Sequence, residues 1–181
     1  MKTLIVFSHS YFDKSRVNRA LLEAASEVPD VTIRNLEELY GRDPQKIDVP
    51  AEQKFLENNT RIVFQFPMFW FNLTPMLKGY MDQVFAHGWA YGTNGHALKG
   101  KQLLLAVTTG APAENYQSPS VGELLLPVTN SGVFTEMDVQ PLRVLHGCLN
   151  ISEADLKKAC NNYKTLLSGG TLCALRALRT F

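Results

Sequence analysis

Short apolar runs alternate along the chain with stretches in which apolar residues recur every three to four positions. Residues 3–8 (TLIVFS) form an apolar run that ends in small polar residues, as in a strand buried on both faces. The period changes after Ser15, which is placed as an N-cap, and the apolar positions that follow have helical spacing. The pattern therefore predicts a strand that leads into a helix through the loop at residues 8–14.

This alternation continues to residue 167. Apolar runs predict further strands at residues 31–36, 61–67, 102–110 and 139–147. Helical spacing predicts helices at residues 50–58, 74–85, 121–132 and 152–167. Thr74 followed by Pro75 is typical of a capped helix start, and Ser152 with Asp155 forms a capping box. Pro127 interrupts the helix at 121–132 and leaves its limits open.

Five buried strands separated by helices predict a parallel sheet with helices on both faces, because right-handed crossovers leave few other solutions. Ligands of such a sheet bind beyond the carboxyl ends of its strands. We therefore expect a site built from residues 8–18, 67–75, 108–116 and 147–150. The pattern also divides the chain into one domain at 1–167 and a short basic tail at 168–181.

Composition narrows the class of protein. The 181 residues are 45% hydrophobic and 19% charged, which suits one globular domain and argues against a disordered chain. The net charge of +1 provides no sequence-wide attraction to nucleic acid or to an anionic membrane. Cys148, Cys160 and Cys173 form neither a C-x-x-C pair nor an even disulfide framework, and the N-terminus lacks a signal-peptide core. We therefore expect a cytoplasmic protein.

Two loops at the predicted carboxyl edge carry candidate chemistry. His9, Ser15 and Asn18 stand where an imidazole, a hydroxyl and the amides of a helix N-terminus can hold a phosphate, although N-capping by Ser15 explains the same spacing. In the second loop, three consecutive aromatic rings at residues 69–71 cannot all point inward. At least one ring is therefore available to a flat ligand or a partner surface, the alternative being a core or dimer contact. The sequence contains no G-x-G-x-x-G after the first strand and no metal-ligand spacing.

Several segments together resemble a known family. H-x(5)-S-x-x-N at residues 9–18, FQFPMFWFNLTPMLKGYMDQVF at 64–85, HGWAYG at 87–92 and TTGAPAENY at 108–116 are similar to the flavodoxin-fold NAD(P)H:quinone oxidoreductases. The similarity is greatest to the small bacterial branch that contains Kef-type potassium efflux ancillary proteins and general-stress NAD(P)H oxidoreductases. The resemblance implies a flavodoxin-like sheet of strand order 2-1-3-4-5.

The resemblance also implies a set of site residues. Those that would wrap the flavin phosphate are His9, Ser15, Arg16, Val17 and Asn18. Those that would run along the isoalloxazine ring are Pro67, Met68, Phe69, Trp70 and Phe71, and those at its other edge are Thr108, Thr109, Gly110 and Ala111. Tyr116 corresponds to a tyrosine that stabilises charge on the reduced flavin, and the amides of residues 109–111 would assist it. The chain departs from the family at Ser10, usually proline, and at Gly122, a second catalytic histidine in mammalian members.

The activity implied by the resemblance is two-electron, ping-pong hydride transfer from NAD(P)H through a flavin to quinones. The flavin would be FMN, with FAD as the alternative, because the family members that bind FAD are longer. A homodimer is implied, in which aromatics such as Trp89 and Tyr91 are exposed to the partner. The alternative is a flavin-bearing regulatory subunit of a membrane potassium efflux antiporter, located at the inner face of the membrane. A one-electron flavodoxin carrier is disfavoured by the charge of +1.

Overall fold

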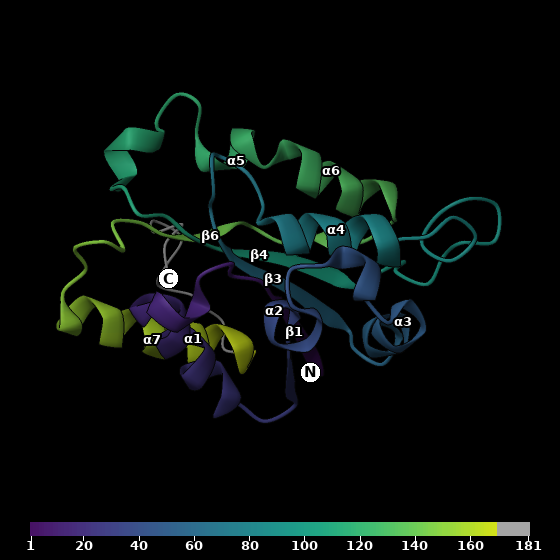
Figure 1. Ribbon diagram of the computed structural model, residues 1–181, viewed down its shortest axis with the longest axis horizontal. Coiled ribbons are helices and arrows are strands. Elements are labelled where there is room, and N and C mark those ends of the chain that lie inside the picture. The colour runs from purple at the N-terminus through teal and green to yellow at the C-terminus, as the bar shows by residue number, and fades with distance from the viewer. Residues whose placement is uncertain (170–181) are drawn as a thin grey trace.

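A parallel β-sheet forms the centre of the molecule in the computed structural model, which describes residues 1–169 (Figure 1). Its strands are β1 (Thr3–Phe7), β2 (Val31–Asn35), β3 (Arg61–Pro67), β4 (Gln102–Thr108), β5 (Asp138–Val139) and β6 (Arg143–Leu145). The order β2-β1-β3-β4-β5 is the predicted one, and β6 is a further strand that also pairs with β4. β1, β3 and nearly all of β4 are buried, as continuous apolar runs require in a doubly covered sheet.

The fifth predicted strand, at 139–147, is wrong in its extent. The structure divides it into β5 and β6, which pair in parallel with the two ends of β4. Gln140 still donates its backbone amide to the carbonyl of Leu103, but Pro141 has no amide to continue the ladder. The chain rejoins the sheet beside Thr108, and this brings His146 and Gly147 to the carboxyl edge.

Helices cover both faces of the sheet (Figure 1). On one face α1 (Arg16–Ser26) packs against α7 (Glu153–Leu167). The other face carries α4 (Pro75–Val84), α5 (Val121–Leu124) and α6 (Leu126–Phe134). The predicted helix at 121–132 is therefore two helices, which break at Leu125, with Pro127 in the first turn of the second. Side chains of α2 (Leu36–Tyr40) and α3 (Val49–Glu57) join the same core as α4, and α2 is an element that the sequence pattern did not indicate.

The helix caps agree with the sequence at two of three positions. Ser15 and Ser152 each accept the backbone amide three residues on, as predicted. Thr74 stands at the N-cap of α4 but makes no capping bond, because its hydroxyl lies 2.5 Å from the hydroxyl of Ser8. Ser8 in turn donates to the carboxylate of Glu37. Thr74 therefore fastens α4 to the end of β1 instead of capping its own helix.

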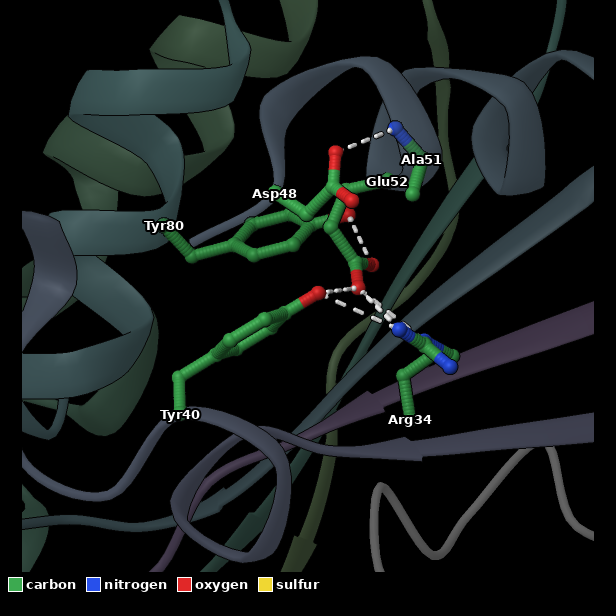
Figure 2. Close-up of polar contacts among 6 residues, drawn as sticks. All are labelled: Arg34, Tyr40, Asp48, Ala51, Glu52 and Tyr80. Atoms are coloured by element: carbon green, nitrogen blue, oxygen red, sulfur yellow. Dashed lines mark hydrogen bonds and ion pairs between the residues drawn. The ribbon is translucent and has the colours of Figure 1, made fainter. Parts of the chain in front are cut away.

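A buried carboxylate connects four elements on the same side of the sheet (Figure 2). Glu52 of α3 is fully buried and accepts from Arg34 of β2 at 2.5 Å and from Tyr40 of α2 at 2.6 Å. Its second oxygen accepts from Tyr80 of α4. Figure 2 shows the three donors converging on this one carboxylate.

Within residues 1–169, no helix combines the length and apolar character that a membrane span needs.

Candidate functional site

A cleft of about 520 Å³ lies at the carboxyl ends of β1, β3 and β4. The loops that follow these strands form its walls, as expected for an open parallel sheet. Its lining residues are His9, Tyr11, Lys14, Ser15, Arg16, Val17, Asn18, Pro67, Met68, Phe69, Thr108, Thr109, Gly110, Cys148 and Leu149. Eleven of them are predicted site residues, drawn from three separate segments. None of the described lining residues is acidic, so the cleft favours an anion.

The N-terminus of α1 forms one end of this cleft. The Ser15 hydroxyl accepts the amide of Asn18 at 3.3 Å, which satisfies one of the free donors of the first turn. The amides of Arg16 and Val17 donate to no group within residues 1–169. Free amides at the positive end of a helix dipole make an anion-binding position. Ser15 is therefore both an N-cap and part of the candidate phosphate site, so both interpretations of the spacing hold.

Hydrogen bonding fixes the protonation state of His9. Its Nδ1 accepts the amide of Tyr11 at 3.1 Å, so the ring proton of the neutral imidazole is on Nε2. Burial lowers the pKa of His9 from its usual 6.5, which favours the neutral ring. The ring also packs edge-on against Phe69, with centroids 5.8 Å apart. His9 thus presents a neutral Nε2–H donor.

The side chain of Arg16 does not point into the cleft. Its guanidinium forms an ion pair with Glu153 and donates to the carbonyl of Ile151 at 2.6 Å, on the loop before α7. Arg16 lines the cleft, as expected, and it is the backbone amide of this residue that is available to a phosphate. Lys14 also lines the cleft. A basic residue directly before the capping serine is the signal that could have identified it.

Asn18 carries an orphaned polar atom. The side chain is only 3% exposed, and its Nδ2 donates to the hydroxyl of Thr108 at 3.1 Å. Its Oδ1 is buried and has no partner in the described part of the chain. A buried unpaired acceptor is costly unless a ligand or water supplies a donor. Asn18 lies on the cleft wall, so a ligand with hydroxyl groups fits beside it.

The loop after β3 is a tight turn with its aromatic residues at the tip. Phe69 and Asn72 exchange backbone hydrogen bonds, and Trp70 and Phe71 adopt positive φ angles of 47° and 63°. Such angles are strained for bulky residues and are typical of functional loops. Phe69 lines the cleft, whereas Trp70 is 94% exposed and Phe71 also faces solvent. The prediction that at least one ring is available to a ligand or partner is confirmed.

The turn after β4 forms the opposite wall. Thr108, Thr109 and Gly110 line the cleft, and Ala111 lies just outside it. The amide of Thr109 donates to the carbonyl of Leu145, so the expectation of free amides at 109–111 is wrong for this residue. The amides of Gly110 and Ala111 make no hydrogen bond in the described structure. A Cβ on Gly110 would lie 3.3 Å from the side chain of Leu149, so the close approach favours glycine.

Tyr116 does not line this cleft. It lies in the short 3₁₀ helix Ala113–Tyr116 and lines a neighbouring pocket of about 390 Å³ with Val121, Leu142 and His146. Its ring packs on that of His146, with centroids 5.4 Å apart.

Trp89 and Tyr91 differ from expectation in another way, because both are half-buried against the core. Trp89 donates its indole N–H to Glu57 at 2.8 Å, so neither residue is an open aromatic surface.

Comparison with known proteins identifies the family of this chain. A family model described as flavodoxin-like fold matches residues 1–167. The chain belongs to this family. An uncharacterised NAD(P)H oxidoreductase of Bacillus subtilis, YdeQ, is 39% identical over 168 residues, which cover 90% of this chain and 84% of the relative.

One further relative and one solved structure are similar to this chain over most of its length. The glutathione-regulated potassium-efflux system ancillary protein KefF of Salmonella arizonae is 38% identical over 167 residues, covering 91% of this chain and 94% of KefF. The crystal structure of general stress protein 14 of Treponema denticola in complex with FMN has a TM-score of 0.85 and 36% identity. It covers 94% of this chain and matches all of the other.

Proposed function

We propose that this protein is an FMN-dependent NAD(P)H:quinone oxidoreductase. The observation that carries the proposal is the cleft itself, because the residues that provide the free helix amides, the neutral His9 donor and the unpaired Asn18 acceptor all line it. Free amides suit a phosphate, and an unpaired buried acceptor suits a hydroxyl-bearing chain. FMN has both. A relative of the same fold was crystallised with FMN, and YdeQ is named as an NAD(P)H oxidoreductase.

The residues divide by the part of the flavin that they would hold. The amides of Arg16 and Val17, with Ser15, His9 and Asn18, would bind the phosphate end. Pro67, Met68 and Phe69 would lie along the ring system, and Thr108, Thr109 and Gly110 would close its other side. When bound, flavin would supply two-electron chemistry between NAD(P)H and a quinone, in which the quinone gains a hydride equivalent and a second proton from solvent.

The protein's own contribution is to stack, orient and stabilise charge. The unpaired amides of Gly110 and Ala111 are donors available to the ring edge that gains negative charge during reduction. Tyr116 is proposed as a third donor, from the neighbouring pocket. Because nicotinamide and quinone are both flat, one stacking position would serve them in turn, which is the basis of a ping-pong cycle.

We also propose that two copies of the chain associate around the cleft. Two large exposed side chains, Tyr11 and Leu149, line the cleft, and two more, Trp70 and Phe71, directly follow Phe69 of its lining. Exposed aromatics gathered at one place are typical of an interface or a ligand-binding surface. A second copy would cover Trp70 and would form the outer wall of the stacking position.

The decisive experiment is reconstitution with FMN. Protein incubated with FMN and desalted should keep a flavin spectrum, quench FMN fluorescence and catalyse quinone-dependent oxidation of NADH or NADPH. FAD tested in parallel decides between the two flavins. A protein that retains neither flavin would refute the proposal. Flavin retention without NAD(P)H oxidation would restrict it to flavin binding.

The similarity to KefF favours one second function, that of a regulatory subunit on a potassium efflux antiporter. The chain covers 94% of KefF, so nearly all of that protein's length has a counterpart here. A test is co-purification with a Kef-type antiporter in detergent, compared with the Trp70→Ala variant. Binding that is lost on Trp70→Ala would support this role, and absence of binding under conditions in which KefF binds would refute it.

A further inference from the structure

His146 connects the cleft to the neighbouring pocket. It follows β6 directly, and its Nδ1 lies 2.9 Å from the hydroxyl of Thr109, which lines the cleft. The same Thr109 hydroxyl donates to the carbonyl of Ala111 at 2.9 Å. The imidazole itself lines the neighbouring pocket. His146 therefore acts on the turn at 109–111 from behind, without facing the cleft.

The proton count determines the direction of the histidine bond. A threonine hydroxyl has one proton, and Thr109 gives it to Ala111. Thr109 must then accept from His146, so Nδ1 of His146 carries a proton. Burial lowers the pKa of His146, with a smaller opposing influence from the Glu114 carboxylate, and the ring is therefore neutral near pH 7. Nε2 is left with its lone pair.

The bond between His146 and Thr109 helps to hold the turn at residues 109–111, whose remaining backbone donors are free. Backbone bonds hold the turn on its outer side: Thr109 donates to Leu145, and Gly147 donates to Ala111. The amides of Gly110 and Ala111 alone are unpaired there. Free amides stabilise a developing charge most when they are already oriented toward it. Reorienting them during the reaction would cost free energy and offset the stabilisation. The Thr109 hydroxyl, locked between Ala111 and His146, provides this orientation.

The imidazole also supports Tyr116. The centroids of the two rings lie 5.4 Å apart and their planes are tilted by 33°, so the rings are in contact without being parallel. All the proposed donors to the flavin edge, the two amides and the phenol, thus depend on one side chain. Among residues 1–169, the titratable groups that act on His146 are Tyr116 and Glu114, which both belong to the 3₁₀ helix Ala113–Tyr116.

We propose that His146 is a positioning residue for flavin reduction, holding the donors of Gly110, Ala111 and Tyr116 toward the flavin edge that gains negative charge. This inference rests on the proposed flavin function. It predicts that loss of His146 affects binding of reduced FMN far more than binding of oxidised FMN, because only the reduced flavin carries the extra charge. A residue with only a structural role would affect both forms alike.

The test compares three variants. His146→Phe keeps a ring against Tyr116 and removes the Nδ1–H donor, whereas His146→Asn retains an N–H near the Nδ1 position. His96→Asn is the matched control, because His96 is exposed and pairs with Glu136, away from the cleft-lining residues. If His146→Phe does not fold, Thr109→Val tests the same bond from its other partner.

The expected result for His146→Phe is about a tenfold loss in the preference for reduced over oxidised FMN, which lowers the two-electron midpoint potential by about 30 mV. Hydride transfer from NAD(P)H should slow at least about fivefold while the Kd for oxidised FMN changes less than about threefold. His146→Asn should recover most of both losses, and His96→Asn should match wild type. In the protein without flavin, ¹⁵N NMR should show a proton on Nδ1 of His146.

Two outcomes separate this inference from the proposed function. If wild-type protein binds no FMN, the proposed function and the inference both fail. If wild-type protein binds FMN and is reduced by NAD(P)H, but His146→Phe and Thr109→Val keep the wild-type potential and rate, only the inference fails. A proton found on Nε2 instead of Nδ1 would also overturn it, because Thr109 would then be the donor to His146.

Discussion

The side-chain amide of Asn18 donates to the hydroxyl of Thr108, 3.1 Å away, and joins the first turn of α1 to the end of β4. The two residues are 90 positions apart in sequence and lie side by side on the cleft wall. This bond sets the distance between the proposed phosphate position and the turn at 109–111. It also leaves the Oδ1 of Asn18 buried and unpaired.

Asn18→Ala should weaken FMN binding by about 1–3 kcal/mol, since it removes one hydrogen bond to the ligand and the bond to Thr108. Ser15→Ala should have an effect of the same size because it loosens the first turn of α1. Fluorescence quenching of FMN measures both. Asn115→Ala, on an exposed residue that does not line the cleft, is the control. Unchanged affinity in both variants would place the phosphate elsewhere.

Tyr116→Phe tests whether the phenol contributes chemistry. The change keeps the ring on His146 and removes only the hydroxyl. A donor aimed at developing charge contributes about 2–4 kcal/mol, so stopped-flow reduction by NAD(P)H should slow about tenfold or more. FMN should stay bound, because Tyr116 does not line the cleft. A rate within about twofold of wild type would restrict Tyr116 to closing the neighbouring pocket.

The aromatic turn should control association. Trp70 is held at the tip by a strained backbone and is almost fully exposed. Buried aromatic anchors dominate many interfaces. Sedimentation should therefore report a dimer for wild-type protein and a shift toward monomer for Trp70→Ala. Leu126→Ala, on an exposed apolar residue of α6, is the control and should leave the dimer intact. A monomeric wild-type protein at micromolar concentration would contradict the shared-cleft arrangement.

The sequence pattern predicts the sheet well because its central strands are buried on both faces. Long apolar runs such as β3 have no competing period, and the predicted limits 61–67 are those of the structure. The pattern fails at the edge. β5 and β6 together have only five residues around a proline, and α2 is too short at five residues to show a helical period. Their positions are set by packing, not by local sequence.

The same division applies to the cleft. The rule that ligands bind at carboxyl ends identifies the right loops, since most of the predicted residues line one cleft. It does not give side-chain directions. Arg16 is drawn away by Glu153, which is 137 residues distant, and His146 gains its place only through Thr109. Contacts of this kind depend on the fold and leave no local pattern.

Two histidines should make stability depend on pH. Burial lowers the pKa of both His9 and His146 from 6.5, so below that value the unfolded chain binds protons that the folded chain does not. The free energy of unfolding should therefore be highest above about pH 6.5 and fall as the pH decreases toward the folded-state pKa values. Urea denaturation at several pH values measures this. In His146→Asn the free energy of unfolding should fall less steeply as the pH decreases. An unchanged dependence on pH would show that the pKa of His146 is not lowered in the folded protein.

The buried carboxylate of Glu52 gives the largest expected effect on stability. Glu52→Gln removes the charge that pairs with Arg34, whose side chain is only 17% exposed, and weakens the bonds from Tyr40 and Tyr80. Leaving a buried charge unpaired costs about 3–5 kcal/mol. Asp82→Asn is the matched control, because its ion pair with Lys78 is exposed and contributes about 0.5 kcal/mol or less.

Urea denaturation of the single variants and of the double variant Arg34→Met/Glu52→Gln forms a cycle that isolates the pair. The double variant has no arginine at position 34, so no buried charge is left unpaired. Its loss in free energy of unfolding should therefore be smaller than the sum of the losses in the two single variants. FMN binding should be unaffected throughout, since none of the residues in Figure 2 lines the cleft. Additive losses would show that Arg34 and Glu52 are not energetically coupled, and that Arg34 is hydrated well enough to need no partner.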